Sequence, residues 1–163
     1  MTAASTPSPL IGTWHLASFE MRDEEGHVAY PFGRESIGFI TYTSDGRMSV
    51  QFGSAHRSDL RYDDWLGATT AEIDASARAY FAYCGTYEVR GNEVIHRIQA
   101  SLIPNWIGGE QLRFWSLDGD TLTIKTPPLR LDGRPQVSIL VWKRVETGDS
   151  RTSHGPLRHR ESG

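Results

Sequence analysis

Residues 36–52 read SIGFITYTSDGRMSVQF, and this stretch decides the fold class. It holds two runs rich in β-branched and aromatic side chains, about 36–43 and 47–52, on either side of Ser44-Asp45-Gly46. An Asp-Gly pair between two such runs predicts a β-hairpin, because glycine tolerates the positive φ that tight hairpin turns demand. The stretch therefore indicates antiparallel strand pairing.

Similar extended runs continue on both sides of this hairpin. They are short and separated by Gly, Pro, Asn and Asp turns, which is typical of a sandwich or barrel rather than of alternating strands and helices. The eight predicted strands span about 11–22, 36–43, 47–52, 86–89, 93–102, 110–117, 121–126 and 136–145. Closure into a barrel would remove exposed sheet edges, and a barrel of this size can leave room for one small ligand.

Residues 60–83 interrupt the strand pattern. Their apolar side chains recur at helical rather than alternating spacing, as Trp65, Leu66, Ile73, Ala77, Tyr80 and Phe81. Gly85 stands where a glycine would end a second helix. The predicted fold is therefore an all-β, closed, eight-stranded antiparallel barrel with a helical insertion of one or two helices between strands 3 and 4.

Composition is that of a single globular domain, with 163 residues of which 38% are hydrophobic and 23% charged. Residues 1–9 and 146–163 are rich in Ser, Thr, Pro, Gly and charge, so we expect both to be disordered tails. The predicted barrel domain spans residues 10–145.

The net charge and the absence of long apolar segments argue against several classes of partner. The net charge is −3, with no concentration of positive charge, so no nucleic-acid partner is expected. No signal segment and no long uncharged apolar run is present, so we expect a cytoplasmic protein without a membrane partner. Cys84 is the only cysteine, which rules out an intramolecular disulfide. Whether the chain forms a homodimer stays open.

Motifs of cofactor-dependent and hydrolytic enzymes are absent from the sequence. It has no Gly-rich phosphate loop, no Gly-x-Ser-x-Gly, no His-Glu-x-x-His and no Cys-x-x-Cys. Its six histidines are widely separated or lie in the C-terminal tail. We therefore expect no cofactor and no metal site.

Several short motifs resemble the lipocalin-like domain family of bacterial and fungal proteins, within the calycin superfamily. They cover nearly all of residues 10–145 and comprise Gly12-Thr13-Trp14, residues 38–50, residues 83–89, Val94-Ile95-His96, residues 104–108, residues 111–114 and residues 140–144. The resemblance implies a calycin barrel that binds a small hydrophobic molecule. Because some calycin-type barrels act as cyclases or isomerases, the resemblance leaves enzymatic activity open.

His96 is the first candidate for chemistry inside the barrel. Alternation places it on the same face as Val94, Ile98 and Ala100, which is the inward face if these apolar residues line the core. An imidazole can donate, accept or transfer a proton near neutral pH. The competing interpretation is a buried histidine whose hydrogen bonds are satisfied by a neighbour.

Arg113 is a candidate ligand-binding residue whose direction the sequence leaves undecided. It shares a face with Gln111 and Trp115, whereas Leu112 and Phe114 occupy the other. If its face is internal, the guanidinium could pair with a carboxylate, enolate or phenolate while Trp115 stacks on it. If it is external, Arg113 is a solvated strand residue.

Four further residues complete the predicted site. Trp106, on a loop between strands, would be a lid or a plug of one barrel end. Tyr42 and Tyr87 are mid-strand phenols that could offer a hydrogen bond from an apolar wall. His56, in the loop before the predicted helices, could reach a ligand at the barrel mouth.

We expect the protein to bind a small hydrophobic organic molecule in the barrel. The alternative is a cyclase or isomerase of secondary metabolism, acting on a polyketide- or terpene-like substrate, with His96 and Tyr87 as the candidate proton-transfer residues. A third interpretation is a barrel filled with side chains that serves as an interaction module.

Overall fold

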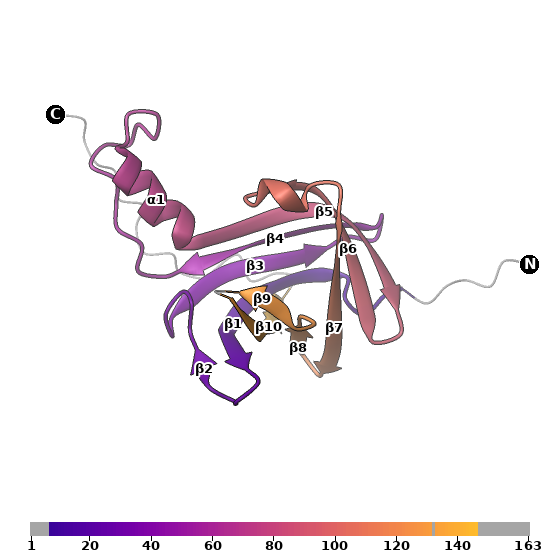
Figure 1. Cartoon of the computed structure of the whole chain (residues 1–163). Helices are drawn as coiled ribbons and strands as arrows, with labels where there is room; N and C mark the ends of the chain where they lie inside the picture. Colours follow the sequence, from indigo (N-terminus) through magenta and orange to yellow (C-terminus); the bar gives the residue numbers. More distant parts are fainter. Residues whose placement is uncertain (1–6, 132, 147–163) are drawn as a thin grey trace, which may run out of the picture.

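The computed structural model describes residues 7–131 and 133–146. Its strands and helices follow one another as β1 (Gly12–Asp23), β2 (Val28–Ala29), β3 (Ser36–Tyr42), β4 (Arg47–Ser54), α1 (Thr70–Arg78), β5 (Tyr80–Arg90), β6 (Glu93–Ser101), the 3-10 helix η1 (Pro104–Trp106), β7 (Glu110–Asp118), β8 (Thr121–Lys125), β9 (Leu129–Leu131) and β10 (Arg134–Arg144). Figure 1 shows the strands curving around a common interior.

The sheet closes on itself because β1 pairs with β3 on one side and with β10 on the other. Within the described residues, eight strands form this ring in the order β1-β3-β4-β5-β6-β7-β8-β10, and all neighbouring pairs are antiparallel. The short strands β2 and β9 pair with β1 and β10 and lie outside the ring. The predicted closed antiparallel barrel is confirmed.

The predicted hairpin forms between β3 and β4. Tyr42 and Met48 are its last paired residues, and the Thr43 N–H donates to the Arg47 carbonyl at 2.9 Å. Gly46 has φ +82°, a value that L side chains rarely adopt. The Asp-Gly prediction is confirmed, and its reason is the positive φ at the glycine.

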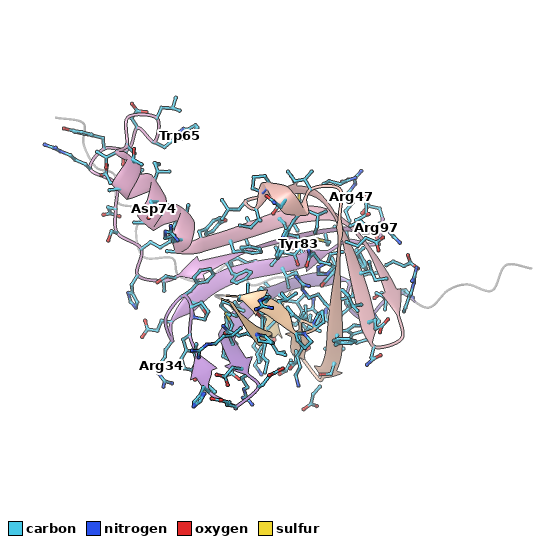
Figure 2. The ribbon with its side chains drawn as sticks, viewed as in Figure 1. Arg34, Arg47, Trp65, Asp74, Tyr83 and Arg97 are labelled. Atoms are coloured by element: carbon cyan, nitrogen blue, oxygen red, sulfur yellow. The ribbon has the colours of Figure 1, made fainter. Side chains whose placement is uncertain are left out.

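The insertion lies between the third and fourth strands of the ring, as predicted, but its helix is short. Helix α1 begins with a capping box, in which Thr69 and Glu72 exchange hydrogen bonds. None of its residues is buried. It projects from the barrel in Figure 1, and Figure 2 shows Trp65, which is 68% exposed, standing on the same projection.

The prediction that helices extend to about residue 83 is wrong, because β5 already begins at Tyr80. Phe81 and Tyr83 alternate on its inner side, a period of two that the spacing of the preceding apolar residues had masked. Gly85 is accordingly no helix end. A Cβ there would lie 1.8 Å from the Arg97 carbonyl oxygen, so glycine is needed for the close approach of β6.

Trp14 organises the end of the barrel at which the N-terminal segment enters. Its side chain is fully buried, and its indole N–H donates to the Leu10 carbonyl at 2.9 Å. Arg144 lies over the ring, with Cζ 3.9 Å from the centroid. It also donates to the carbonyls of Ile11 at 3.1 Å and Pro9 at 3.0 Å. These contacts fix residues 9–11 against the barrel.

Most of the two predicted tails, residues 1–6 and 147–163, lies outside the described residues. The described part of the first tail includes Ser8, whose carbonyl accepts from the Ile11 N–H at 3.1 Å, and Pro9, held by Arg144.

In the part of the chain that the structure describes, the helices are too short or too polar for any of them to cross a membrane.

Candidate functional site

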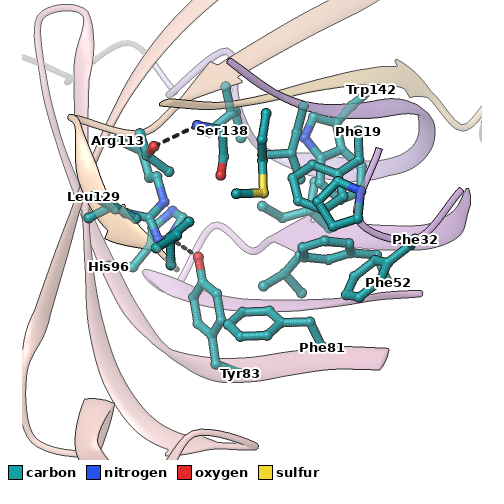
Figure 3. A pocket seen from close by; sticks show the side chains of 18 of the residues that line it. Phe19, Phe32, Phe52, Phe81, Tyr83, His96, Arg113, Leu129, Ser138 and Trp142 are labelled. Atoms are coloured by element: carbon teal, nitrogen blue, oxygen red, sulfur yellow. Dashed lines mark hydrogen bonds between the residues drawn. The ribbon is translucent and has the colours of Figure 1, made fainter. Parts of the chain in front are cut away.

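The barrel interior contains a cavity of about 300 Å³ that is partly open to solvent. Apolar cavities of roughly half that volume hold a benzene molecule, so a substituted aromatic ring fits here. Figure 3 shows one wall built from Phe19, Phe32, Phe52, Phe81 and Trp142, facing a more polar end with His96, Tyr83 and Arg113. The cavity is therefore apolar along most of its length and polar at one end.

The aromatic wall is a set of tilted and edge-to-face ring contacts contributed by four strands and the loop before β3. Phe52 is central, with ring centroids 5.3 Å from Phe19, 5.6 Å from Phe32 and 6.2 Å from Trp142. Such tilted pairs stabilise each other beyond their buried area. The wall is thus preformed, so its side chains lose less conformational entropy when a ligand binds.

His96 sits at the polar end between two tyrosines. It is 1% exposed, and the apolar Val94 and Ile98 on the same face of β6 are buried with it, so the predicted inward direction is confirmed. Its Nε2 lies 2.9 Å from the Tyr42 hydroxyl, and its Nδ1 lies 2.9 Å from the Tyr83 hydroxyl. Both ring nitrogens therefore have a partner.

Tyr42, His96 and Tyr83 form a hydrogen-bonded triad, and burial keeps all three groups uncharged. Burial, and to a smaller extent the Arg113 cation, lowers the pKa of His96 to about 3. Burial raises the pKa of the Tyr42 phenol well above its ordinary value. Burial also raises the pKa of Tyr83, although Arg113 opposes this shift. At neutral pH the three groups are an uncharged imidazole and two phenols.

The neutral triad has one hydroxyl proton to spare. A neutral imidazole donates through one nitrogen and accepts through the other, so one tyrosine donates to it and the other accepts from it. The accepting tyrosine keeps its own O–H proton for another partner. Tyr83 lines the cavity, and when it is the accepting residue its proton is available to an acceptor oxygen on a ligand.

Arg113 brings the positive charge to this end of the cavity. It is 5% exposed, and its guanidinium donates to the Leu112 carbonyl at 2.8 Å and to Gln111 Oε1 at 3.3 Å. Its Cζ lies 5.9 Å from the Trp106 ring centroid. The structure thus decides the question that alternation left open: the Arg113 face of β7 looks inward.

A model of the lipocalin-like domain family matches residues 11–145, which is most of the chain and includes every strand of the barrel. This chain belongs to the lipocalin-like domain family. The resemblance carried by the sequence motifs is confirmed.

A carrier protein is among the relatives of this lipocalin-like protein. The 4'-hydroxy-3'-methoxypropiophenone carrier protein of Aspergillus oryzae is 34% identical over 91 residues, which cover 50% of this chain and 82% of the relative. No solved structure matched the chain significantly. The barrel and the carrier relative together support ligand binding.

The structure brings three of the predicted site residues to the cavity of this lipocalin-like barrel, His96, Arg113 and Trp106. Tyr42 lies behind His96 and contacts it without lining the cavity. Trp115 packs against the core from the same face as Arg113, but it is Trp106 whose ring lies near the guanidinium.

Tyr87 and His56 are placed elsewhere. The Tyr87 hydroxyl donates to the Thr43 carbonyl at 2.9 Å, and its ring packs on Tyr42 with centroids 4.8 Å apart. His56 is exposed, with Nε2 2.6 Å from Glu35 Oε2. It lies in a separate surface hollow that shares Pro31 and Phe32 with the cavity lining. The structure does not bring either residue into the cavity.

Sequence reasoning missed Tyr83 and most of the aromatic wall. Tyr83 and Phe81 fell in the region assigned to helices, so their alternation was not considered. Ser138 and Trp142 are inward residues of β10, and alternation within 136–145 was the signal that could have found them.

One exposed cluster has the composition of a weak metal site. Asp23, Glu25 and His27 lie at the turn after β1 with their potential ligand atoms within 4.8 Å of one another. Asp23 already accepts from the backbone N–H groups of Glu25 and His27 at 3.0 and 2.9 Å. The turn is explained by these hydrogen bonds.

Proposed function

We propose that this protein binds and carries a small aromatic molecule inside its barrel. The observation that carries the proposal is the preformed cavity of about 300 Å³, apolar along its walls, with hydrogen-bonding groups gathered at one end. Ligand pockets commonly combine such walls with a few polar groups that orient the ligand.

The energetics favour a ligand with one polar end. Burial of about 300 Å² of apolar ligand surface contributes about 7 kcal/mol at ~25 cal/mol per Å². Association opposes binding by about 4–15 kcal/mol, so a rigid cavity and a well-placed polar partner are needed for useful affinity. Tyr83 and Arg113 are the polar partners that the cavity offers.

The Aspergillus oryzae relative supports the ligand class. Its name describes a carrier of a phenolic aromatic ketone. A ring of that kind matches the aromatic wall, and its oxygen substituents match donors such as the Tyr83 hydroxyl and the Arg113 guanidinium. We infer that this chain takes a ligand of similar size and polarity.

The rival function, a cyclase or isomerase, needs a residue that moves a proton. His96 is poorly suited, because its pKa is lowered to about 3 and both of its nitrogens are bonded to tyrosines. Tyr87 is bonded to a backbone carbonyl outside the cavity. These contacts favour binding over proton transfer.

We also propose that the protein works in the cytoplasm. The chain has one cysteine, Cys84, whose exposed side chain is compatible with a reducing compartment.

Filling the cavity tests the proposal. Ser138 is a buried lining residue of β10, whereas its neighbour Ile139 points to the other side of the wall. We expect wild type to bind 4'-hydroxy-3'-methoxypropiophenone or 4-nitrophenol at one site in isothermal titration calorimetry. Ser138→Phe should weaken this binding at least tenfold, because the new ring occupies the cavity.

Ile139→Phe is the matched control, since it adds a ring of the same size on the same strand outside the cavity. It should bind as wild type does. Equal binding by Ser138→Phe and wild type, or no binding of either aromatic compound by wild type, would contradict the proposal.

A further inference from the structure

Arg113 is a charge without a counter-charge. Among residues 7–131 and 133–146, its polar partners are the neutral oxygens of Gln111, Leu112 and Tyr83, and no carboxylate forms an ion pair with it. Neutral acceptors satisfy the N–H groups, but they do not cancel the charge. A buried cation in this state is destabilising unless an anion or water accompanies it.

The other titratable groups around Arg113 leave its charge in place. Among the described residues they are His96 on β6, Tyr83 on β5 and Tyr42 on β3, all of which are uncharged near neutral pH. The described residues that line the cavity include no Asp, Glu or Lys. The described lining therefore carries one net positive charge in a cavity whose other walls are mostly apolar.

A cavity of this kind favours anionic ligands over neutral ones. An anionic oxygen next to Arg113 is stabilised by the cation, and the interaction is strong because burial excludes competing water. A neutral ligand of the same shape gains the apolar contacts but leaves the charge uncompensated. Figure 3 shows Arg113 at the same end of the cavity as Tyr83, whose hydroxyl can donate to the same oxygen.

We propose that the cavity takes its ligand in anionic form, as a small aromatic molecule whose phenolate or carboxylate oxygen is bound by Arg113 and Tyr83. This inference rests on the proposed function and narrows it from aromatic ligands in general to aromatic acids and acidic phenols. The ring lies against the phenylalanine wall, and the charged oxygen lies at the polar end.

The probe pair 4-nitrophenol and 4-nitroanisole tests the charge directly. The two have nearly the same shape, but only the phenol ionises, and its neutral and anionic forms absorb at different wavelengths. A titration from about pH 5 to pH 9 isolates the probe, because His96 and both tyrosines stay neutral in this range. We expect wild type to lower the pKa of bound 4-nitrophenol by at least about one unit.

Such a shift means that the phenolate binds about tenfold more tightly than the phenol, or about 1.4 kcal/mol. At pH 8, wild type should also prefer 4-nitrophenol to 4-nitroanisole by at least tenfold. A second pair, 4-nitrobenzoate and 4-nitrobenzamide, shows whether a carboxylate is taken in the same way, and the tighter of the two anions identifies the class.

Three variants separate the cavity charge from other effects. Arg113→Gln should abolish the preference and raise the pKa of the bound phenol, because an apolar cavity without a cation disfavours the anion. Arg113→Lys should keep a reduced preference. Arg97→Gln is the matched control, because Arg97 is a partly exposed arginine on β6 paired with Glu88 and Glu110 outside the cavity, and it should behave as wild type.

The possible results are distinct for the two proposals. Equal binding of both members of each pair by wild type, with no shift in the pKa of the phenol, would overturn the anion proposal and leave the carrier proposal intact. A preference that survives in Arg113→Gln would also overturn it. No binding of any of the four compounds would overturn the carrier proposal itself.

Discussion

Two arginines of the barrel lie near a tryptophan ring, and their surroundings differ. Arg144 stacks on Trp14 with Cζ 3.9 Å from the ring centroid, donates to two backbone carbonyls and lies 3.5 Å from an Asp120 carboxylate oxygen. Arg113 lies 5.9 Å from the Trp106 centroid and has neutral hydrogen-bond acceptors. The first charge ties β10 to the segment before β1, and the second faces the cavity.

The comparison shows that two arginine–tryptophan pairs serve different purposes in the same barrel. At the Trp14 end, Trp14 and Arg144 donate to the backbone carbonyls of residues 9–11, and neither side chain lines the cavity. At the cavity end, the fold leaves a charge and a phenolic proton available. Loss of Trp14 or Arg144 should therefore lower stability, whereas loss of Arg113 should alter binding.

The largest expected effect is on stability, from Trp14→Ala. Trp14 is fully buried and its ring supports Arg144 and Leu10. Its removal should reduce the free energy of unfolding by about 3–5 kcal/mol, measured by urea denaturation. A loss below about 1 kcal/mol would show that this end does not carry the fold.

Acid should destabilise the protein through His96, which lies at the cavity end. The pKa of His96 is lowered from 6.5 to about 3 in the folded state, so the unfolded chain binds more protons between these values and stability falls as pH decreases through this window. Between pH 7 and pH 4.5 the contribution of His96 is about 2–3 kcal/mol.

Comparison with His96→Gln isolates this contribution from that of the acidic residues. Urea denaturation at both pH values should show a smaller acid-induced loss for the variant than for wild type, by about 2–3 kcal/mol. Equal losses in the two proteins would mean that His96 becomes protonated without penalty, contrary to its burial.

The two tyrosines of the triad provide a sharper comparison. Tyr42→Phe and Tyr83→Phe each remove one hydrogen bond to His96 and should each reduce the free energy of unfolding by about 1 kcal/mol. Only Tyr83 lines the cavity. Tyr83→Phe should therefore weaken 4-nitrophenolate binding by about fivefold, and Tyr42→Phe should not. Equal effects on binding would remove Tyr83 from the site.

The smallest effect is expected from Arg113→Met without ligand. Removal of an unpaired buried charge in favour of an apolar side chain should leave the free energy of unfolding within about 1 kcal/mol of wild type, or raise it. Arg144→Met should lower it, by about 1–2 kcal/mol, because two carbonyls lose their donor. If Arg113→Met lowered the free energy of unfolding more than Arg144→Met in urea denaturation, the division between the two ends would be contradicted.

Local patterns predicted the barrel better than the cavity. The Asp45-Gly46 turn and the alternation around His96 were readable, because turn conformation and strand period depend on neighbouring residues. The direction of Arg113 was not, because both faces of β7 carry aromatic side chains. Tyr83 was missed because residues 80–83 continue a helical spacing, and only pairing with β4 and β6 makes them a strand.

The contacts that define the site also join distant segments. Tyr42, Tyr83 and His96 come from three strands, and no spacing rule predicts that one imidazole will bridge two phenols. That no described carboxylate pairs with Arg113 is likewise a property of all the surrounding strands together.

Ligand-induced stabilisation tests the central proposal, a binding cavity in the barrel, most directly. Urea unfolding is measured for wild type, Arg144→Gln and Ser138→Phe, with and without 4-nitrophenol at pH 8 and about 100 times its Kd for wild type. Wild type and Arg144→Gln should each gain about 2.7 kcal/mol, whereas Ser138→Phe should gain much less. A gain of equal size in Ser138→Phe, or no gain in wild type, would contradict the assignment of the cavity as the binding site.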